Sequence, residues 1–267
     1  HVAVLRALVA AGANLDAAGA AGVAPAAAAA GSGHWLALQL LAEARACPDA
    51  RDNEGRTALI HAACRGNAKM VALLVQCRAD LEAAGAESGT AIAAAMVERQ
   101  WLVLRRLADA RADLSARVPG DERALLVRAA EEMQWDTVSH LAKRGADVRA
   151  RGTLGRTPLM LAAGGGQEDV VWLLLQRRAD PDAQDAKGET ALTFACGRRL
   201  EGTMRLLWES GADIKDAIQR VRCGSMRQLL EEWNGPDANE ERSDRAEARA
   251  PPSRAAGRVP PRRLAPR

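Results

Sequence analysis

Apolar residues along the first 234 positions recur at helical spacing, in short blocks separated by glycine and polar residues. In the clearest block, Thr157 and Pro158 open an apolar run that ends at the glycines of 164–166. A threonine N-cap followed by a first-turn proline is typical of a helix start, since proline needs no amide partner there. The pattern predicts a short helix, a second and longer helix from about Gln167 to Arg177, and an extended hairpin leading into the next block.

The longer helix of each block carries two apolar positions three residues apart. The first position is filled by Leu38, Val71, Leu104, Val138, Val171 and Met204, and the second by Leu41, Leu74, Leu107, Leu141, Leu174 and Leu207. Residues at i and i+3 share one face of a helix. This stripe therefore predicts burial against the neighbouring blocks.

The blocks repeat with a period of 33 residues. An alanine marks the phase at Ala13, Ala46, Ala79, Ala112, Ala146, Ala179 and Ala212, with one step of 34. An Asp or Asn follows each alanine except Ala46, which precedes Cys47. A fixed period of this length indicates a stack of similar units. Such a stack presents an extended surface rather than a single cleft.

The segments 155–163 and 178–180 resemble the ankyrin repeat, whose pattern is G-x-T-P-L-H-x-A-A-x-x-G-H with a later L-L-x-x-G-A-D. Similar starts occur at 55–59 and 188–192, and weaker ones at 22–25, 88–90 and 123–126. The resemblance covers about residues 1–230. It implies an all-α, ankyrin-repeat α-solenoid of stacked helix-turn-helix units with β-hairpin loops.

The resemblance divides the chain into six full units flanked by partial ones. The full units are expected at 19–51, 52–84, 85–118, 119–151, 152–184 and 185–217. Residues 1–18 would be a truncated half-repeat and 218–234 a capping half-repeat. Because His1 falls at the head of a second helix, and arrays need caps with a polar outer side, we expect at least one further repeat upstream.

Two departures from the family pattern bear on stability. The glycine that ends the second helix is kept at three places but replaced at Arg45, Arg78, Arg111 and Arg178. If those arginines keep a left-handed backbone, each costs about 1 kcal/mol relative to glycine. The third and fourth units also lack the Thr-Pro start, and one residue is inserted near 118–120. We therefore predict that these two units form the weak joint of the array.

Charge is balanced in the repeats and basic only at the end of the chain. Residues 1–234 hold 29 basic and 29 acidic residues, whereas 235–267 hold eight arginines and five acids. A balanced body argues against polyanion binding, so nucleic acid could be bound only through the tail. The Pro-, Arg- and Ala-rich tail has almost no large apolar residues and is predicted to be disordered.

Cysteine usage and hydropathy bear on the compartment. The five scattered cysteines form no C-x-x-C pair and no even framework, which favours a reduced cytoplasmic or nuclear protein. No apolar run reaches 18 residues, so no membrane span is predicted.

Candidate chemistry is sparse. His61 and Cys64 have a spacing that suits two metal ligands, but a zinc site needs two more. The glycines at 31–33 and 164–166 lack the partner residues of nucleotide loops, and tight turns are the favoured interpretation. No G-x-S-x-G elbow is present. We therefore predict no catalytic, cofactor or metal site, no small-molecule substrate and no enzymatic activity.

Tryptophans fall at two kinds of position. Trp35, Trp101 and Trp135 share one register at the start of the second helix, where they could cover the shoulder between units or contact a partner. Trp172 and Trp208 lie at other registers and are predicted to be structural.

The resemblance implies that a protein partner contacts hairpin tips and the exposed side of the first helix. The matching tip residues are Asn53, Glu54, Arg56, Asp121, Arg123, Thr153, Leu154, Arg156, Lys187 and Glu189. The matching first-helix residues are Arg65, Glu98, Glu131, Glu132 and Arg198. Their alternating charge would steer and select a partner. Reversing Glu131 and Glu132 is expected to weaken binding with little effect on folding, as for exposed charges in general.

Two functions follow from these observations. The favoured one is a non-catalytic scaffold that binds a partner protein through the concave groove and the hairpin tips. The alternative is a targeting module of a larger enzyme whose catalytic domain lies outside this sequence. Binding of nucleic acid through the tail is a third hypothesis, and such binding would collapse with salt.

Overall fold

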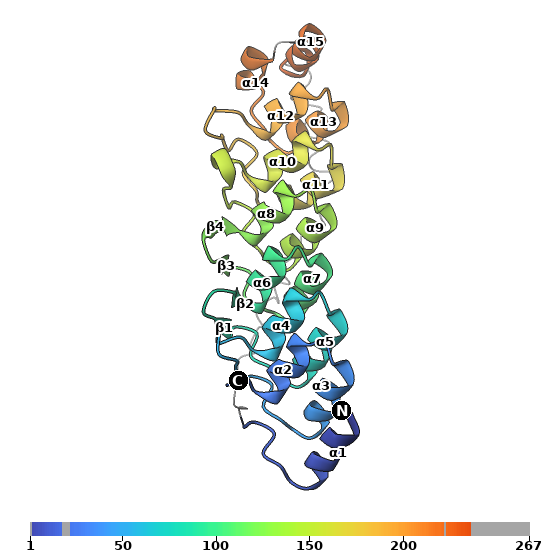
Figure 1. Cartoon of the computed structure of the whole chain (residues 1–267). Coiled ribbons are helices and arrows are strands. Elements are labelled where there is room, and N and C mark those ends of the chain that lie inside the picture. The colour runs from blue at the N-terminus through green and yellow to red at the C-terminus, as the bar shows by residue number, and fades with distance from the viewer. Residues whose placement is uncertain (1, 18–21, 222, 236–267) are drawn as a thin grey trace, which may run out of the picture.

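The computed structural model describes residues 2–17, 22–221 and 223–235. It is an elongated stack in which helices form two parallel rows and the loops and hairpins lie along one side (Figure 1). The predicted all-α repeat architecture is confirmed. The disorder predicted for the tail concerns residues that, from 236 on, lie outside the described part of the chain.

Each of the six full units contributes a short first helix and a longer second helix. The first helices have seven residues each: α2 (Pro25–Gly31), α4 (Ala58–Cys64), α6 (Ala91–Val97), α8 (Leu125–Glu131), α10 (Pro158–Gly164) and α12 (Ala191–Gly197). The second helices have nine each: α3 (Trp35–Glu43), α5 (Ala68–Gln76), α7 (Trp101–Asp109), α9 (Trp135–Lys143), α11 (Glu168–Gln176) and α13 (Glu201–Glu209). The second helix expected over about 167–177 is therefore correct to within one residue at each end.

Helices also flank the six units. The stack begins with α1 (Val2–Ala10) and ends with α14 (Lys215–Arg220) and α15 (Gly224–Trp233). The helix pair at the end therefore starts three residues before the boundary expected for the capping half-repeat. Trp208 is buried, and its ring stacks on that of Trp233 with centroids 5.3 Å apart, which fastens α15 to the sixth unit.

The connections between units vary more than a uniform hairpin pattern predicts. Within the described residues, strands pair at β1 (Ala84–Gly85) with β2 (Gly89–Thr90), and at β3 (Arg117–Val118) with β4 (Asp121–Ala124). The second pair has an irregular register between Arg117 and Val118, beside the inserted residue. In the fifth unit the tip is a 3-10 turn, η1 (Thr153–Gly155). The insertion is thus absorbed in the hairpin and leaves the helix lengths unchanged.

The two-position stripe of the second helices forms the centre of the core. All twelve of its residues are at most 2% exposed. The first helices add small residues, such as Ala62, Ala95 and Ala162, that let neighbouring units approach closely. The burial predicted from periodicity is confirmed. Removal of this apolar area from water stabilises the stacking of the units.

Threonine side chains cap the first helix in three of the six full units. Thr57, Thr157 and Thr190 each accept a hydrogen bond from the backbone N–H three residues later. Thr90 in the third unit makes no such bond and its buried hydroxyl is unsatisfied, while the fourth unit has Ala124 at this position. Loss of an N-cap costs about 1 kcal/mol.

The arginines that replace helix-ending glycines do adopt the left-handed conformation. Their φ values are 60° at Arg45, 60° at Arg78, 69° at Arg111 and 63° at Arg178. The fold therefore tolerates the steric penalty of a Cβ at four places along one edge of the stack.

Carboxylates link the loops of successive units, and we call them the joint carboxylates. Asp16, Asp49, Glu82 and Asp182 each accept a hydrogen bond, 2.6–2.8 Å long, from a backbone N–H 31 residues later. The equivalent residues at the third-to-fourth and fourth-to-fifth joints are Ser115 and Arg149. Two consecutive joints in the middle of the array therefore lack this link.

Hydrogen exchange should reach the third and fourth units first. We expect the amides of 85–151 to exchange before those of 152–217, because both units lack a threonine cap and their following joints lack the carboxylate. Local opening follows such differences in local stability. Native-state exchange followed by mass spectrometry measures it, and equal protection of the two segments would contradict the prediction.

Candidate functional site

The predicted first-helix residues lie in one row at the C-terminal ends of the first helices. Arg65, Glu98, Glu132 and Arg198 are the C-cap residues of α4, α6, α8 and α12, and Glu131 is the last residue of α8. The fold thus repeats one position from unit to unit along the stack. Arg65, Glu98 and Arg198 are exposed.

Glu131 and Glu132 differ from the other members of this row because intramolecular bonds hold them. Glu131 accepts hydrogen bonds from Arg123 Nη1 at 2.6 Å and from the backbone N–H of Thr153 at 3.0 Å. Glu132 pairs with Arg99 of the third unit at 3.0 Å. Their side chains are only 18% and 20% exposed. The expectation that these are free, exposed charges is therefore wrong, and we now expect their reversal to destabilise the array, because these charges link three units.

Asp121 and Arg123 form the centre of this network. Asp121 accepts two hydrogen bonds from the Arg123 guanidinium at 2.8 Å and one from Arg128 at 3.0 Å. The hydrogen bonds from the Arg123 side chain lower the pKa of Asp121 from 3.8 to about 2, although burial opposes the shift. The same bonds raise the pKa of Arg123. Two predicted hairpin-tip residues thus stabilise the fourth unit itself.

Replacing Asp121 by asparagine should change how stability depends on acid. A carboxyl whose pKa is lower in the folded state stabilises the fold above its ordinary pKa and loses that contribution as pH falls. The stability advantage of the natural chain over Asp121→Asn should therefore be full above about pH 4 and shrink towards pH 2. Urea unfolding midpoints of both chains from pH 5 to pH 2 measure it. A difference that stays constant over this range would contradict the role given to Asp121.

The hairpin tip of the second unit contains a smaller network around Asp52. This carboxylate accepts hydrogen bonds from the Arg56 backbone N–H at 2.8 Å, from the Arg56 side chain at 3.1 Å and from the Glu54 backbone N–H at 2.9 Å. It also bonds His61 Nε2 at 2.8 Å. Burial raises the pKa of Asp52, but these bonds outweigh it and keep the pKa below its usual value. His61 is therefore engaged in the tip and does not pair with Cys64. Among the described residues, no group of three or more metal-ligating side chains is present.

The fifth and sixth units present a mixture of held and exposed tip residues. The Arg156 guanidinium lies over the Phe194 ring, 5.2 Å from its centroid, and 3.8 Å from Asp185. Lys187 is exposed, and Leu154 is 50% exposed at a φ of 60°. Of the remaining predicted tip residues, Asn53, Glu54 and Thr153 are exposed and Glu189 is half-buried.

A cavity of about 530 Å³ lies between the sixth unit and the terminal helix pair, beside Lys187 and Glu189. Cys196 and Cys223 also line it. A hydrogen bond with Ser225 lowers the pKa of Cys223 to about 7, whereas burial raises the pKa of Cys196 to about 12. No signal in the repeat pattern pointed to this cavity, because it is formed by the irregular last units.

The tryptophans are distributed as follows. Trp35, Trp101 and Trp135 are half-buried and pack against the core. Trp208 is structural, as predicted. Trp172 is 45% exposed, so its predicted structural role is wrong. The same register in other second helices is filled by exposed residues such as Ala72 and Arg205, which explains the exposure.

The repeat geometry agrees with the similarity of the chain to a known protein family. A family model for ankyrin repeats (3 copies) matches residues 1–85 and 126–218. The chain belongs to the ankyrin-repeat family. The unmatched stretch, residues 86–125, covers nearly all of the third unit, which lacks the threonine cap bond, and the inserted residue near 118–120. No curated protein sequence matches the chain.

Known structures similar to this chain include two ankyrin repeat domains and one chain of an endopeptidase complex. The ankyrin repeat domain of Bcl-3, a member of the IkappaB family, is 25% identical (TM-score 0.58; 78% of this chain and 91% of that chain covered). An ankyrin repeat domain from Acinetobacter baumannii is 28% identical (0.59; 71% and 98%). A chain of the complex between the predatory endopeptidase Bd0816 of Bdellovibrio bacteriovorus and the immunity protein Bd3460 is 29% identical (0.51; 69% and 97%).

Ankyrin repeats generally mediate protein–protein interactions, and ankyrin-repeat domains are typically non-catalytic. None of the helices in the described part of the chain is long and apolar enough to cross a membrane.

Proposed function

We propose that this ankyrin-repeat protein is a non-catalytic scaffold that binds a partner protein through its concave groove and hairpin tips. The observation that carries the proposal is the row of exposed C-cap charges at Arg65, Glu98 and Arg198, whose side chains form no hydrogen bond or ion pair with the other described residues. Exposed tip residues such as Leu154 and Lys187 lie on the same repeating loops. A partner that contacts one face of several units buries a surface large enough for specific recognition.

The charges along this row alternate between basic and acidic, and this pattern would favour a partner with the complementary charges. A complementary surface would present acidic groups to Arg65 and Arg198 and a basic group to Glu98. Such complementarity raises the association rate and excludes wrong partners more than it adds affinity. We place this activity in the cytoplasm or the nucleus, where the five unpaired cysteines would stay reduced.

The test uses a partner captured with the full chain, with three exposed charges then reversed. The triple variant Arg65→Glu, Glu98→Lys and Arg198→Glu should slow association about tenfold or more, with an unchanged unfolding midpoint. The matched control is Arg106→Glu, Lys143→Glu and Glu201→Lys, which changes the net charge equally on exposed positions of the second helices. Equal association rates for both variants would refute the assignment of the surface.

A further inference from the structure

We propose a second docking surface, on the opposite edge of the stack, for an acidic segment of a partner protein. The segment's carboxylates would enter two adjacent cavities between the third, fourth and fifth units, where the array lacks its own joint carboxylates. This proposal goes beyond the concave groove, because it uses other residues, which lie at the opposite end of the first helices.

The first observation is the interrupted series of joint carboxylates. Where the series is intact, a carboxylate from one loop accepts a hydrogen bond from a backbone N–H in the next loop. The donors are Cys47, Asp80, Asp113 and Asp213. The equivalent N–H groups at the two central joints belong to Asp147 and Asp180, and the positions of the missing carboxylates are filled by Ser115 and Arg149. These joints keep the N–H donor of a carboxylate site but have lost the carboxylate.

The second observation is that a cavity opens at each of these two joints. One of about 630 Å³ is lined by residues that include Ser115 and Asp147, and one of about 490 Å³ by residues that include Arg149 and Asp180. The cavities are one repeat apart along the same edge. A foreign group therefore has room at the places where an internal carboxylate is missing.

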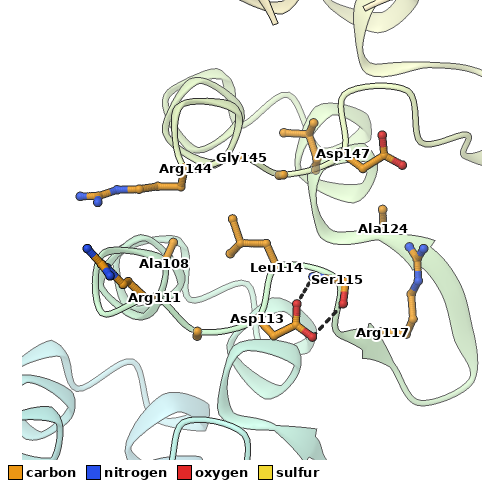
Figure 2. A pocket seen from close by; sticks show the side chains of 13 residues that line it. Ala108, Arg111, Asp113, Leu114, Ser115, Arg117, Ala124, Arg144, Gly145 and Asp147 are labelled. Carbon is orange, nitrogen blue, oxygen red and sulfur yellow. Dashed lines mark hydrogen bonds between the residues drawn. The ribbon is translucent and has the colours of Figure 1, made fainter. Parts of the chain in front are cut away.

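The third observation is the charge around the cavities. Arg111, Arg117 and Arg144 line the first, with Arg111 and Arg144 at one end and Arg117 at the other (Figure 2). Arg149, Arg151 and Arg178 line the second. Arginine is well suited to carboxylates because its planar guanidinium can donate two parallel hydrogen bonds.

Some of these charges are already partly engaged. Arg144 pairs with Asp109, Arg149 donates to the carbonyl of Arg178, and Arg151 donates to the carbonyl of Gln184 at 2.7 Å. The bonds of Arg149 and Arg151 go to neutral carbonyls, so their positive charge is not neutralised. Both cavities therefore keep cationic groups that an acidic ligand could pair with.

The acidic residues in the cavities are turned to their own loops. Asp113 accepts from the backbone and the hydroxyl of Ser115, at 2.8 and 2.7 Å, as Figure 2 shows. Asp147 accepts from the backbone N–H of Arg149 at 2.9 Å, and Asp180 from that of Asp182 at 3.0 Å. These aspartates order the loops that carry the N–H donors.

Two of the lining arginines hold a strained backbone. Arg111 and Arg178 stand at φ 69° and 63°, where glycine is favoured and is found at Gly145 and Gly211. The same conformation occurs at Arg45 and Arg78, where the joint carboxylates are intact, so the backbone conformation is common to all four arginines. At the two cavities these residues add the positive charge of their side chains.

The surface is separate from the concave groove. Leu126, at the N-terminal end of α8, lines the first cavity, whereas Glu131 and Glu132 lie at the C-terminal end of the same helix. The two sites are therefore at opposite ends of the first helices, and a variant in one leaves the other in place.

Repeat spacing sets the probe. Stacked helices lie about 8–10 Å apart, and a polyproline II chain advances about 9 Å in three residues, which returns to the same face. A peptide with four Glu-Pro-Pro repeats thus places its carboxylates at the spacing of successive joints. The Gln-Pro-Pro peptide of equal length is its neutral control.

The experiment measures binding of the labelled Glu-Pro-Pro peptide to the full chain by fluorescence anisotropy. The variant Ser115→Asp with Arg149→Asp restores the internal carboxylates, so it should raise the unfolding temperature and weaken peptide binding about tenfold or more. The control Arg6→Asp with Ser32→Asp makes the same charge changes at exposed positions near the start of the stack, away from both proposed surfaces. It should bind the peptide as the natural chain does.

A further variant covers the case in which the restored carboxylates disturb the loops. Arg111→Ala with Arg117→Ala removes two lining charges and should also weaken binding of the Glu-Pro-Pro peptide about tenfold. The proposal is overturned if the neutral peptide binds equally well, or if the control pair loses as much affinity as the restored pair. It is also overturned if a single-stranded oligothymidylate binds the same cavities more tightly than the peptide, because the ligand would then be a nucleic acid.

Discussion

Replacing Leu141 by alanine is expected to lower the free energy of unfolding by about 3 kcal/mol. Leu141 is fully buried in α9, which contacts α7 and α11. Truncation therefore removes apolar contacts of the fourth unit with the third and fifth units and leaves a cavity in the middle of the array. Equilibrium urea unfolding, monitored by circular dichroism, measures the loss.

The control for this prediction is Leu102→Ala. Leu102 lies in the neighbouring α7 but is 52% exposed, so its loss should cost less than about 1 kcal/mol. If the two variants lose equal stability, the packing described for the second helices is wrong. A transition that becomes broader in Leu141→Ala would further locate the weak joint, since stability in such arrays depends on coupling between neighbours.

Replacing Trp208 by alanine is expected to cost about 3–5 kcal/mol and to release the terminal helix. The Trp208 side chain is 2% exposed and stacks on Trp233 of α15. Aromatic pairs of this kind add stability beyond the area that they bury. Amides of 224–233 should therefore lose their protection from hydrogen exchange while those of 152–184 keep theirs.

Trp172→Ala is the matched control for the aromatic prediction. Trp172 has the same side chain but is 45% exposed on α11, and its removal should leave exchange at 224–233 unchanged. If the amides of 224–233 lose protection in both variants, the opening of α15 has another cause than the loss of the Trp208–Trp233 stack.

Periodicity predicted most of the fold, for a physical reason. A 33-residue phase and an i, i+3 stripe report which side of a helix is buried, and stacking of identical units repeats that burial. The twelve stripe residues, the threonine caps and the left-handed arginines at Arg45, Arg78, Arg111 and Arg178 were all predictable from their position within a unit.

Pairing between units could not be predicted in the same way. The bonds of Glu131 and Glu132 depend on Arg123, Arg99 and the Thr153 backbone, which are contributed by neighbouring hairpins and turns. The inserted residue near 118–120 also reshapes the hairpin that carries Asp121 and Arg123. One signal was available in the sequence: aligning the units shows acids at 16, 49, 82 and 182 and their absence at Ser115 and Arg149.

The most direct test of the proposed function compares the full chain with a chain that ends at Gly235, against one captured partner. If the repeats form the binding surface, the shortened chain should bind nearly as tightly as the full chain, while the triple variant at Arg65, Glu98 and Arg198 binds more weakly. Loss of binding on removal of 236–267, with normal binding by the triple variant, would contradict the account and make the tail the functional element.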